Sequence, residues 1–211
     1  MSARVAKKLM MTQHGAGTLD GQFDRLIPRE LQHLSANHWT PLDIAVRAAT
    51  LLCPTAQTRI LDVGSGIGKL CTVGALSTLG TWVGVEQHEP LVRTASCLAR
   101  KLGVGGRTRF LHADAFSLDW NEYDALYFYN PFELSLFGDQ SLNPRRSTQI
   151  ARVQQRLAAL PNATRVVTFH GFGGVMPETF ELLYHERVPA CGLDLALWMQ
   201  RRYRAGSRVA S

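Results

Sequence analysis

The stretch RILDVGSGIGKLCTVGA, residues 59–75, combines a short apolar run with three glycines in five positions. The apolar run at 59–63 predicts a buried strand, and residues 69–80 predict a helix that Gly80 ends. A strand, a glycine turn and a helix in this order begin several nucleotide-binding α/β architectures. The stretch therefore decides the fold class, and its glycine spacing indicates which ligand the loop holds.

Segments on both sides of this stretch alternate between short β-rich runs and helical patterns. Residues 1–39 are predicted to be a tail and an irregular or helical lead-in, and residues 40–211 a single domain. The helix at 40–54 has Thr40 as its expected N-cap, Pro41 at its first position and Pro54 beyond its end. The predicted strands are 59–63, 81–86, 108–114, 123–130, 164–171, 180–188 and 194–203, and the later helices are 69–80, 89–104 and 144–160.

The order of these elements predicts the topology. Strands alternating with helices favour a parallel sheet with covered faces, whereas the last two strands are joined by the short segment PACGL and favour an antiparallel pair. We therefore expect an α/β fold: a doubly wound, mostly parallel seven-stranded sheet with a C-terminal antiparallel hairpin and helices on both faces.

Composition narrows the class of protein. Of 211 residues, 45% are hydrophobic and 19% charged, an ordinary globular balance. The most apolar run, 42–52, contains Asp43 and Arg47, so we expect no membrane span. The four cysteines form no CxxC pair and no Cys/His cluster, which argues against a metal site and favours a reducing compartment, the cytoplasm. We interpret all four as small buried side chains.

The net charge of +6 is concentrated at the two ends of the chain. Arg4, Lys7 and Lys8 lie near one end, and no acidic residue follows Asp194 at the other. Such ends suit nucleic acid, a ribosome or an acidic protein surface. We interpret them as solvated tails, because no aromatic residues interleave with the basic ones as in base-stacking surfaces. The N-terminal stretch has too short an apolar segment for a secretory signal, although it faintly resembles an organelle transit peptide.

The glycine loop fails the pattern of a phosphate-binding P-loop. That pattern requires G-x-x-x-x-G-K-[ST], but Val63 stands at its first glycine and Leu70 at its hydroxyl residue. The dinucleotide pattern G-x-G-x-x-G fits poorly, because its third glycine falls on Lys69 or Cys71, depending on the start. An NAD(P)-dependent Rossmann oxidoreductase remains an alternative.

An acid followed by G-x-G-x-G stands here instead, from Asp62 to Gly68. This pattern resembles the first motif of class I S-adenosylmethionine-dependent methyltransferases. It suits that ligand, which has a cationic amino-acid end and no phosphate: an Asp at a strand end accepts from an ammonium, and glycines let the backbone pass close to the ligand.

Residues at three further strand ends agree with the resemblance, which covers about residue 40 to the C-terminus. Glu86 follows the second strand, where the family binds the ribose hydroxyls, and Asp114 follows the third, where it contacts the adenine. The resemblance implies the cofactor S-adenosyl-L-methionine, held by Thr40, Asp62, Gly64, Ser65, Gly66, Gly68, Glu86, Gln87, Asp114, Ala115 and Asn130.

The sequence Asn130-Pro131-Phe132 follows the fourth strand, where the family has its catalytic motif. In amino-group methyltransferases [DNS]-P-P-[YFW] aims the lone pair of the acceptor amine. The second proline is absent here, and the shorter form resembles that of seven-strand lysine methyltransferases, as does HWTPLDIA, residues 38–45. The implied catalytic residues are Tyr129, Asn130 and Pro131.

The resulting hypothesis is an enzyme that methylates a nitrogen nucleophile. A protein lysine is the favoured acceptor, a small molecule is the alternative, and nucleic acid has weak support. A non-catalytic cofactor-binding scaffold is a further alternative. We interpret His112, Glu133 and His170 as structural, although each follows or ends a strand on the ligand-binding edge. The sequence does not indicate an oligomeric state.

Overall fold

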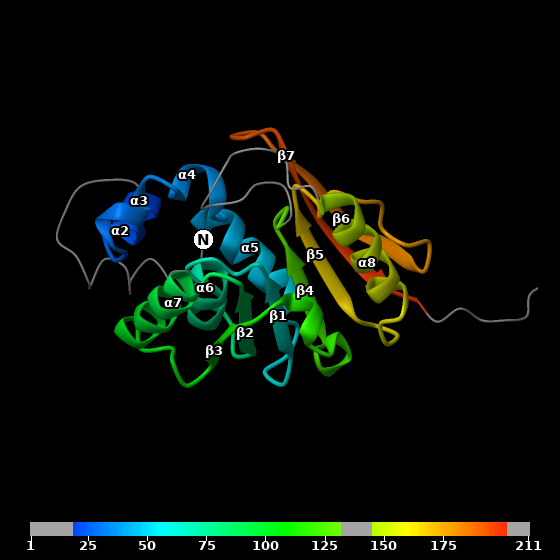
Figure 1. Ribbon diagram of the computed structural model, residues 1–211. Helices are drawn as coiled ribbons and strands as arrows, with labels where there is room; N and C mark the ends of the chain where they lie inside the picture. Colours follow the sequence, from blue (N-terminus) through cyan, green and yellow to red (C-terminus); the bar gives the residue numbers. More distant parts are fainter. Residues whose placement is uncertain (1–18, 132–144, 202–211) are drawn as a thin grey trace, which may run out of the picture.

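A computed structural model describes residues 19–131 and 145–201 (Figure 1). Its strands form one seven-stranded sheet in the order β3-β2-β1-β4-β5-β7-β6. Strands β1 to β5 pair in parallel, and β7 pairs antiparallel with both β5 and β6. The predicted mixed sheet with its C-terminal hairpin is confirmed. The strand bounds are β1 Arg59–Val63, β2 Thr81–Glu86, β3 Thr108–His112, β4 Ala125–Phe128, β5 Arg165–Phe169, β6 Phe180–Val188 and β7 Leu193–Gln200.

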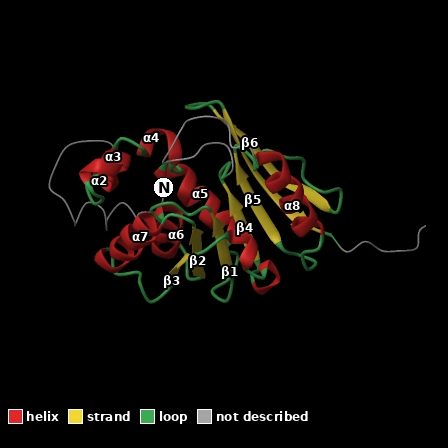
Figure 2. Ribbon diagram, viewed as in Figure 1, coloured by secondary structure: helices red, strands yellow, loops and turns green. Residues whose placement is uncertain are grey.

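Helices cover both faces of the sheet (Figure 2). One buried cluster joins the lead-in, α5, α6 and α7 to one face, and the other joins α8 and two 3-10 turns to the opposite face. The lead-in is helical in three short pieces. The bounds are α2 Leu19–Asp24, α3 Arg29–Gln32, α4 Ser35–His38, α5 Leu42–Leu52, α6 Lys69–Ser77, α7 Glu89–Lys101, η1 Ala115–Ser117, η2 Trp120–Glu122 and α8 Arg146–Ala158.

The first helix of the main domain begins differently from the prediction. Helix α5 begins at Leu42, one residue later than expected, and Pro41 rather than Thr40 holds its N-cap position. The carboxylate of Asp20, on α2, accepts from the Leu42 N–H at 3.0 Å and supplies the cap. The prediction of Thr40 as the cap is wrong because a side chain 22 residues away satisfies this N–H.

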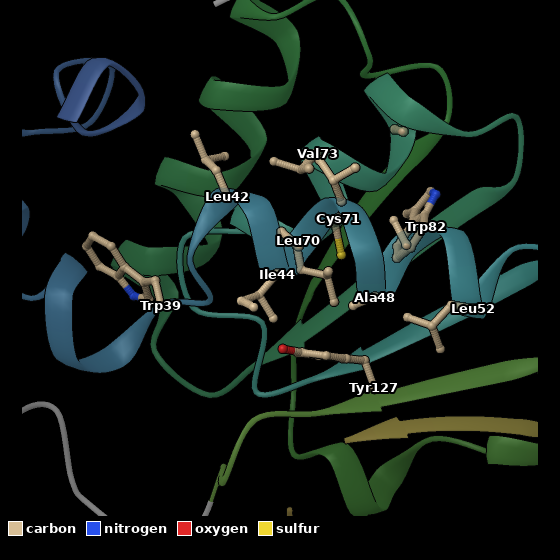
Figure 3. Packing of buried hydrophobic residues seen from close by; sticks show 14 of the residues in the cluster. Trp39, Leu42, Ile44, Ala48, Leu52, Leu70, Cys71, Val73, Trp82 and Tyr127 are labelled. Atoms are coloured by element: carbon tan, nitrogen blue, oxygen red, sulfur yellow. The ribbon is translucent and has the colours of Figure 1, made fainter. Parts of the chain in front are cut away.

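Close packing between α6 and β2 anchors the glycine loop to the sheet. A Cβ on Gly74 would lie 2.3 Å from the Trp82 ring, so the helix lies directly on that fully buried indole. In Figure 3, Trp82 and Trp39 lie at opposite ends of the cluster, and the Tyr127 hydroxyl points toward the Trp39 end.

The cysteines depart from the prediction that all are buried. Cys71 is buried, but Cys53 is partly exposed and Cys97 and Cys191 are exposed, because they lie at a helix end, on an outer helix face and in a hairpin turn. In the described ranges no helix has the length and apolar character of a membrane span. The same ranges contain no cluster of side chains suited to a metal ion.

Candidate cofactor and active site

The candidate site lies where the strand order reverses, between β1 and β4. Ligands of open α/β sheets bind at this switch point, at the carboxyl ends of the strands. The loop after β1 reaches the segment after β4 at Gly64, where an added Cβ would lie 2.9 Å from the Cβ of Pro131. Gly64, Gly66 and Gly68 all have positive φ, which glycine adopts without strain. The glycine loop and the Asn130-Pro131 segment are thus neighbours, as the resemblance requires.

Four N–H groups of the glycine loop are engaged by the protein itself. Gly64 and Ser65 donate to Val85 O at 3.0 Å, and Gly68 donates to Ser65 O at 2.8 Å. Gly66 donates to the Glu86 carboxylate at 3.0 Å. A phosphate-gripping loop directs such N–H groups at its ligand. In this loop the four N–H groups donate to protein oxygens instead.

Glu86 ends β2 as a buried carboxylate, 7% exposed. One oxygen accepts from Gly66 N, and the other accepts from His88 N at 2.9 Å. A carboxylate has about four lone-pair sites, so each oxygen retains capacity for a hydroxyl donor. The next residue, Gln87, has an exposed side chain and a backbone carbonyl 3.0 Å from His112 Nε2.

Asp62 lies on β1 beneath the loop and is 4% exposed. Burial raises the pKa of its carboxyl from 3.8 to about 7; a hydrogen bond from Cys71 Sγ, at 3.5 Å, opposes the rise, and the Glu86 carboxylate adds to it. No cationic side chain is among these causes. Two buried acids beside one loop create a negative potential that favours a cationic ligand group.

Asn130 and its neighbours form the second half of the site. Asn130 has φ +38°, and its N–H donates to Gly171 O at 2.9 Å. Its Oδ1 is buried without a hydrogen-bond partner among the described residues. The partly buried Tyr129 packs on Phe169, with ring centroids 4.9 Å apart. This acceptor oxygen beside the loop is therefore available to a donor from a bound ligand.

The remaining sequence-predicted residues lie around these two halves. Asp114 is exposed and accepts from Phe116 N at 2.9 Å, which caps the turn that Ala115 begins. Thr40 is buried, and its hydroxyl lies 2.8 Å from that of Tyr127 on β4. His170 is exposed, has φ +59° and directly follows β5, next to Gly171, which accepts from Asn130 N. Phe132 and Glu133 lie outside the described residues.

Sequence reasoning missed two residues that border the loop. Trp39 packs on Gly66, where an added Cβ would lie 3.1 Å from the indole Nε1. Lys69 begins α6 almost fully buried, and its ammonium lies 2.6 Å from Asp20 and 5.2 Å from the centre of the Phe23 ring. No local pattern signals the Lys69 pair, because its acidic partner Asp20 lies 49 residues away in the sequence.

The topology and the groups at its switch point define a class. The chain has the Rossmann-like fold of class I S-adenosylmethionine-dependent methyltransferases. An RNA methyltransferase from Salinibacter ruber, solved with S-adenosyl-L-homocysteine, matches with a TM-score of 0.60 and 21% identity, over 78% of this chain and 94% of that one. TrmN from Thermus thermophilus matches with a TM-score of 0.65 and 17% identity, over 88% of this chain and 54% of that one. At these identities the likeness establishes the fold.

A curated protein also matches part of the sequence. The chain is 29% identical over 122 residues to the 23S rRNA (uracil(1939)-C(5))-methyltransferase RlmD of Burkholderia thailandensis. The match covers 54% of this chain but 26% of that protein, so this chain spans about a quarter of the relative's length. No protein-family model matches the sequence.

Proposed function

We propose that the chain is an S-adenosylmethionine-dependent methyltransferase. The observation that carries the proposal is the glycine loop, four of whose N–H groups are engaged internally while two buried carboxylates lie beside it. Such a loop suits a ligand that bears a cation and no phosphate. S-adenosylmethionine has this chemistry, since it carries an ammonium and a sulfonium.

The NAD(P) alternative fits these contacts less well. A pyrophosphate needs donors at the loop, but the N–H groups of Gly64, Ser65, Gly66 and Gly68 already donate to protein oxygens. The carboxylate of Asp62 would in addition repel it. An oxidoreductase of the dinucleotide type is therefore the weaker proposal.

Each acid has a role in holding the cofactor. Asp62, at the end of β1, accepts from the ammonium of the amino-acid part, and the lone pairs left on Glu86 accept from the ribose hydroxyls. The exposed carboxylate of Asp114 lies after β3, at the adenine end of the proposed site. The bound cofactor supplies an electrophilic methyl group.

Asn130 orients the methyl acceptor. Its Oδ1, which has no partner among residues 19–131 and 145–201, accepts a hydrogen from the acceptor's amino group, which fixes the direction of the nitrogen lone pair. The Pro131 carbonyl is the second acceptor, and Tyr129 provides an aromatic surface for a flat base or an aliphatic stem. The nitrogen must be neutral when it attacks, and a partly desolvated site favours the neutral amine.

RNA is the acceptor class that we propose. Two relatives are named as RNA methyltransferases, one of them an rRNA methyltransferase. The net charge of +6 agrees with a polyanionic partner. The predicted protein lysine acceptor receives no support from these relatives and stands as the second candidate, favoured by the Asn-Pro-Phe sequence.

The four free cysteines agree with a cytoplasmic location.

Two experiments test this proposal. Calorimetry should detect S-adenosylhomocysteine binding and no NAD(P) binding; the reverse result would reject the cofactor assignment. Cell extract incubated with the protein and S-adenosylmethionine labelled in its methyl group should then gain label in the RNA fraction. Label in protein alone would reassign the acceptor, and the Asn130→Gly variant, which lacks the orienting oxygen, is the matched control.

A further inference from the structure

Trp39 differs from the other three tryptophans of the chain. The indole N–H groups of Trp82, Trp120 and Trp198 donate to Thr78 Oγ1, Ala115 O and Thr168 Oγ1, at 3.2, 2.9 and 3.4 Å. Trp39 Nε1 has no partner among the residues that the structure describes, although the side chain is only 5% exposed. A buried donor without an acceptor is unfavourable, so it indicates that a ligand supplies the acceptor.

The indole edge faces the glycine loop. The Cβ position of Gly66 lies 3.1 Å from Nε1 and 3.3 Å from Cδ1 of Trp39, so the polar edge of the ring lies directly against the loop. Figure 3 shows this indole at the edge of the apolar cluster, with the nitrogen on its inner side. The donor therefore borders the proposed cofactor site and does not face bulk solvent.

Neighbouring contacts fix Trp39 in this place. The next residue, Thr40, bonds the Tyr127 hydroxyl, and Asp20 holds both the first N–H of α5 and the ammonium of Lys69 at the start of α6. Trp39 thus lies just before a helix whose first turn is tied through Asp20 to the start of α6. Its position is set by packing and hydrogen bonds before any ligand binds.

The same contacts place Trp39 toward the Asp62 end of the loop. The Tyr127 hydroxyl, which bonds Thr40, lies near enough to Asp62 for the two to influence each other electrostatically. In an α-amino acid the carboxylate is two bonds from the carbon-bound ammonium nitrogen. A ligand whose ammonium pairs with Asp62 therefore brings its carboxylate to the same end of the loop.

That carboxylate needs a donor, because Asp62 and Glu86 repel it and four loop N–H groups are engaged. We propose that the indole N–H of Trp39 donates to the carboxylate of the ligand's amino-acid part. Trp39 is then a binding residue that selects a zwitterionic amino-acid end. This inference rests on the proposed cofactor.

A pair of ligands and a pair of variants test it in the full chain. S-adenosylhomocysteine and its decarboxylated analogue, S-adenosyl-3-thiopropylamine, differ only in the carboxylate. Trp39→Phe keeps an aromatic ring and removes the N–H, whereas Trp198→Phe removes an indole that bonds Thr168 on the neighbouring strand. Dissociation constants are measured by calorimetry for each combination.

We expect Trp39→Phe to weaken S-adenosylhomocysteine binding by about tenfold to a hundredfold, the range for a hydrogen bond to a charged group. Its affinity for the decarboxylated analogue should stay within about threefold of the parent, and Trp198→Phe should change neither. Equal weakening for both ligands would overturn the inference and assign Trp39 a packing role. Unchanged affinity for both would overturn it as well.

Nuclear magnetic resonance of the parent protein gives a second test, which does not depend on whether the Trp39→Phe variant folds. The indole N–H signal of Trp39, identified by eliminating the other three with single variants, should move downfield with S-adenosylhomocysteine and not with the analogue. No movement with a bound ligand would refute the donor role alone. Absence of S-adenosylhomocysteine binding by the parent protein would instead reject the proposed function and this inference together.

Discussion

Replacing Asp62 with asparagine should stabilise the ligand-free protein and lower its affinity for the ligand. The substitution keeps the size and the hydrogen-bond acceptor for Cys71 but removes a charge that is only 4% exposed. Burial is the main cause that raises the pKa of Asp62 from 3.8 to about 7. The ionised carboxylate is therefore unfavourable in the folded state.

The magnitude follows from proton linkage. Each pH unit between the folded and unfolded pKa corresponds to about 1.4 kcal/mol, so ionised Asp62 costs the folded protein about 4 kcal/mol. Between pH 4 and 7 the folded state holds a proton that the unfolded state has released. The favourable contribution of the protonated group is complete below pH 4 and is lost as the pH rises to about 7. Asparagine has no such loss.

Urea unfolding between pH 4.5 and 8.5 measures the difference. The free energy of unfolding of Asp62→Asn, relative to the parent, should rise with pH by up to about 1.4 kcal/mol per unit and level off above pH 7, near 4 kcal/mol. Asp43→Asn, at a position 61% exposed on α5, is the control and should show no comparable rise. A difference that stays constant with pH would refute the reasoning.

Three further substitutions separate binding, turnover and stability. Glu86→Gln should weaken S-adenosylhomocysteine binding by roughly 1.5–3 kcal/mol in calorimetry, since a charged acceptor is lost; an unchanged affinity would contradict its ribose role. Asn130→Gly, which tolerates the positive φ, should bind the cofactor normally but lower the transfer rate by about a hundredfold; full turnover would exclude the orienting role. Asp20→Asn should lower the free energy of unfolding by about 2–3 kcal/mol, because among the described residues Lys69 then keeps only Asp24, at 3.8 Å, as a charged partner. A smaller loss than for a surface asparagine substitution would show that the buried pair adds no stability.

Local sequence patterns predicted the elements well, and their errors fall at the ends. Strand β1 and strand β6 have the predicted bounds, because glycines, prolines and charged residues interrupt the apolar runs there. Strand β4 ends at Phe128, two residues before the prediction, since Asn130 turns into the left-handed region. An apolar pattern does not reveal such a turn, which depends on the carbonyl of Gly171 in the loop after β5.

The candidate site was predictable only where its residues are local. The spacing of Asp62 and the glycines predicts their role, and the place of Glu86 at the end of an apolar strand predicts its role. Trp39 lies in the segment HWTPLDIA, which resembles the entry to the first helix of seven-strand lysine methyltransferases, but that resemblance assigns no role to its indole N–H, whose place against Gly66 depends on tertiary packing. Thr40 was assigned a cap by its position before a proline, but Asp20 supplies that cap through a contact distant in sequence.

Three unfavourable features meet at the switch point, and a zwitterionic methyl donor together with an amine acceptor relieves all of them. Within the part of the chain that the structure describes, Asp62 is buried with its charge uncompensated, Trp39 has a donor without an acceptor, and Asn130 has an acceptor without a donor on a left-handed backbone. Departures from local rules that gather at one place indicate function, since selection otherwise removes their cost. The cofactor's ammonium pairs with Asp62, and its carboxylate accepts from the Trp39 indole N–H. The amine of the methyl acceptor donates to Asn130. A dinucleotide pyrophosphate can accept from Trp39, but it brings no cation to Asp62 and adds a second anion beside it, and four N–H groups of the loop already donate to protein oxygens. The site is therefore better suited to a zwitterionic methyl donor than to a redox dinucleotide.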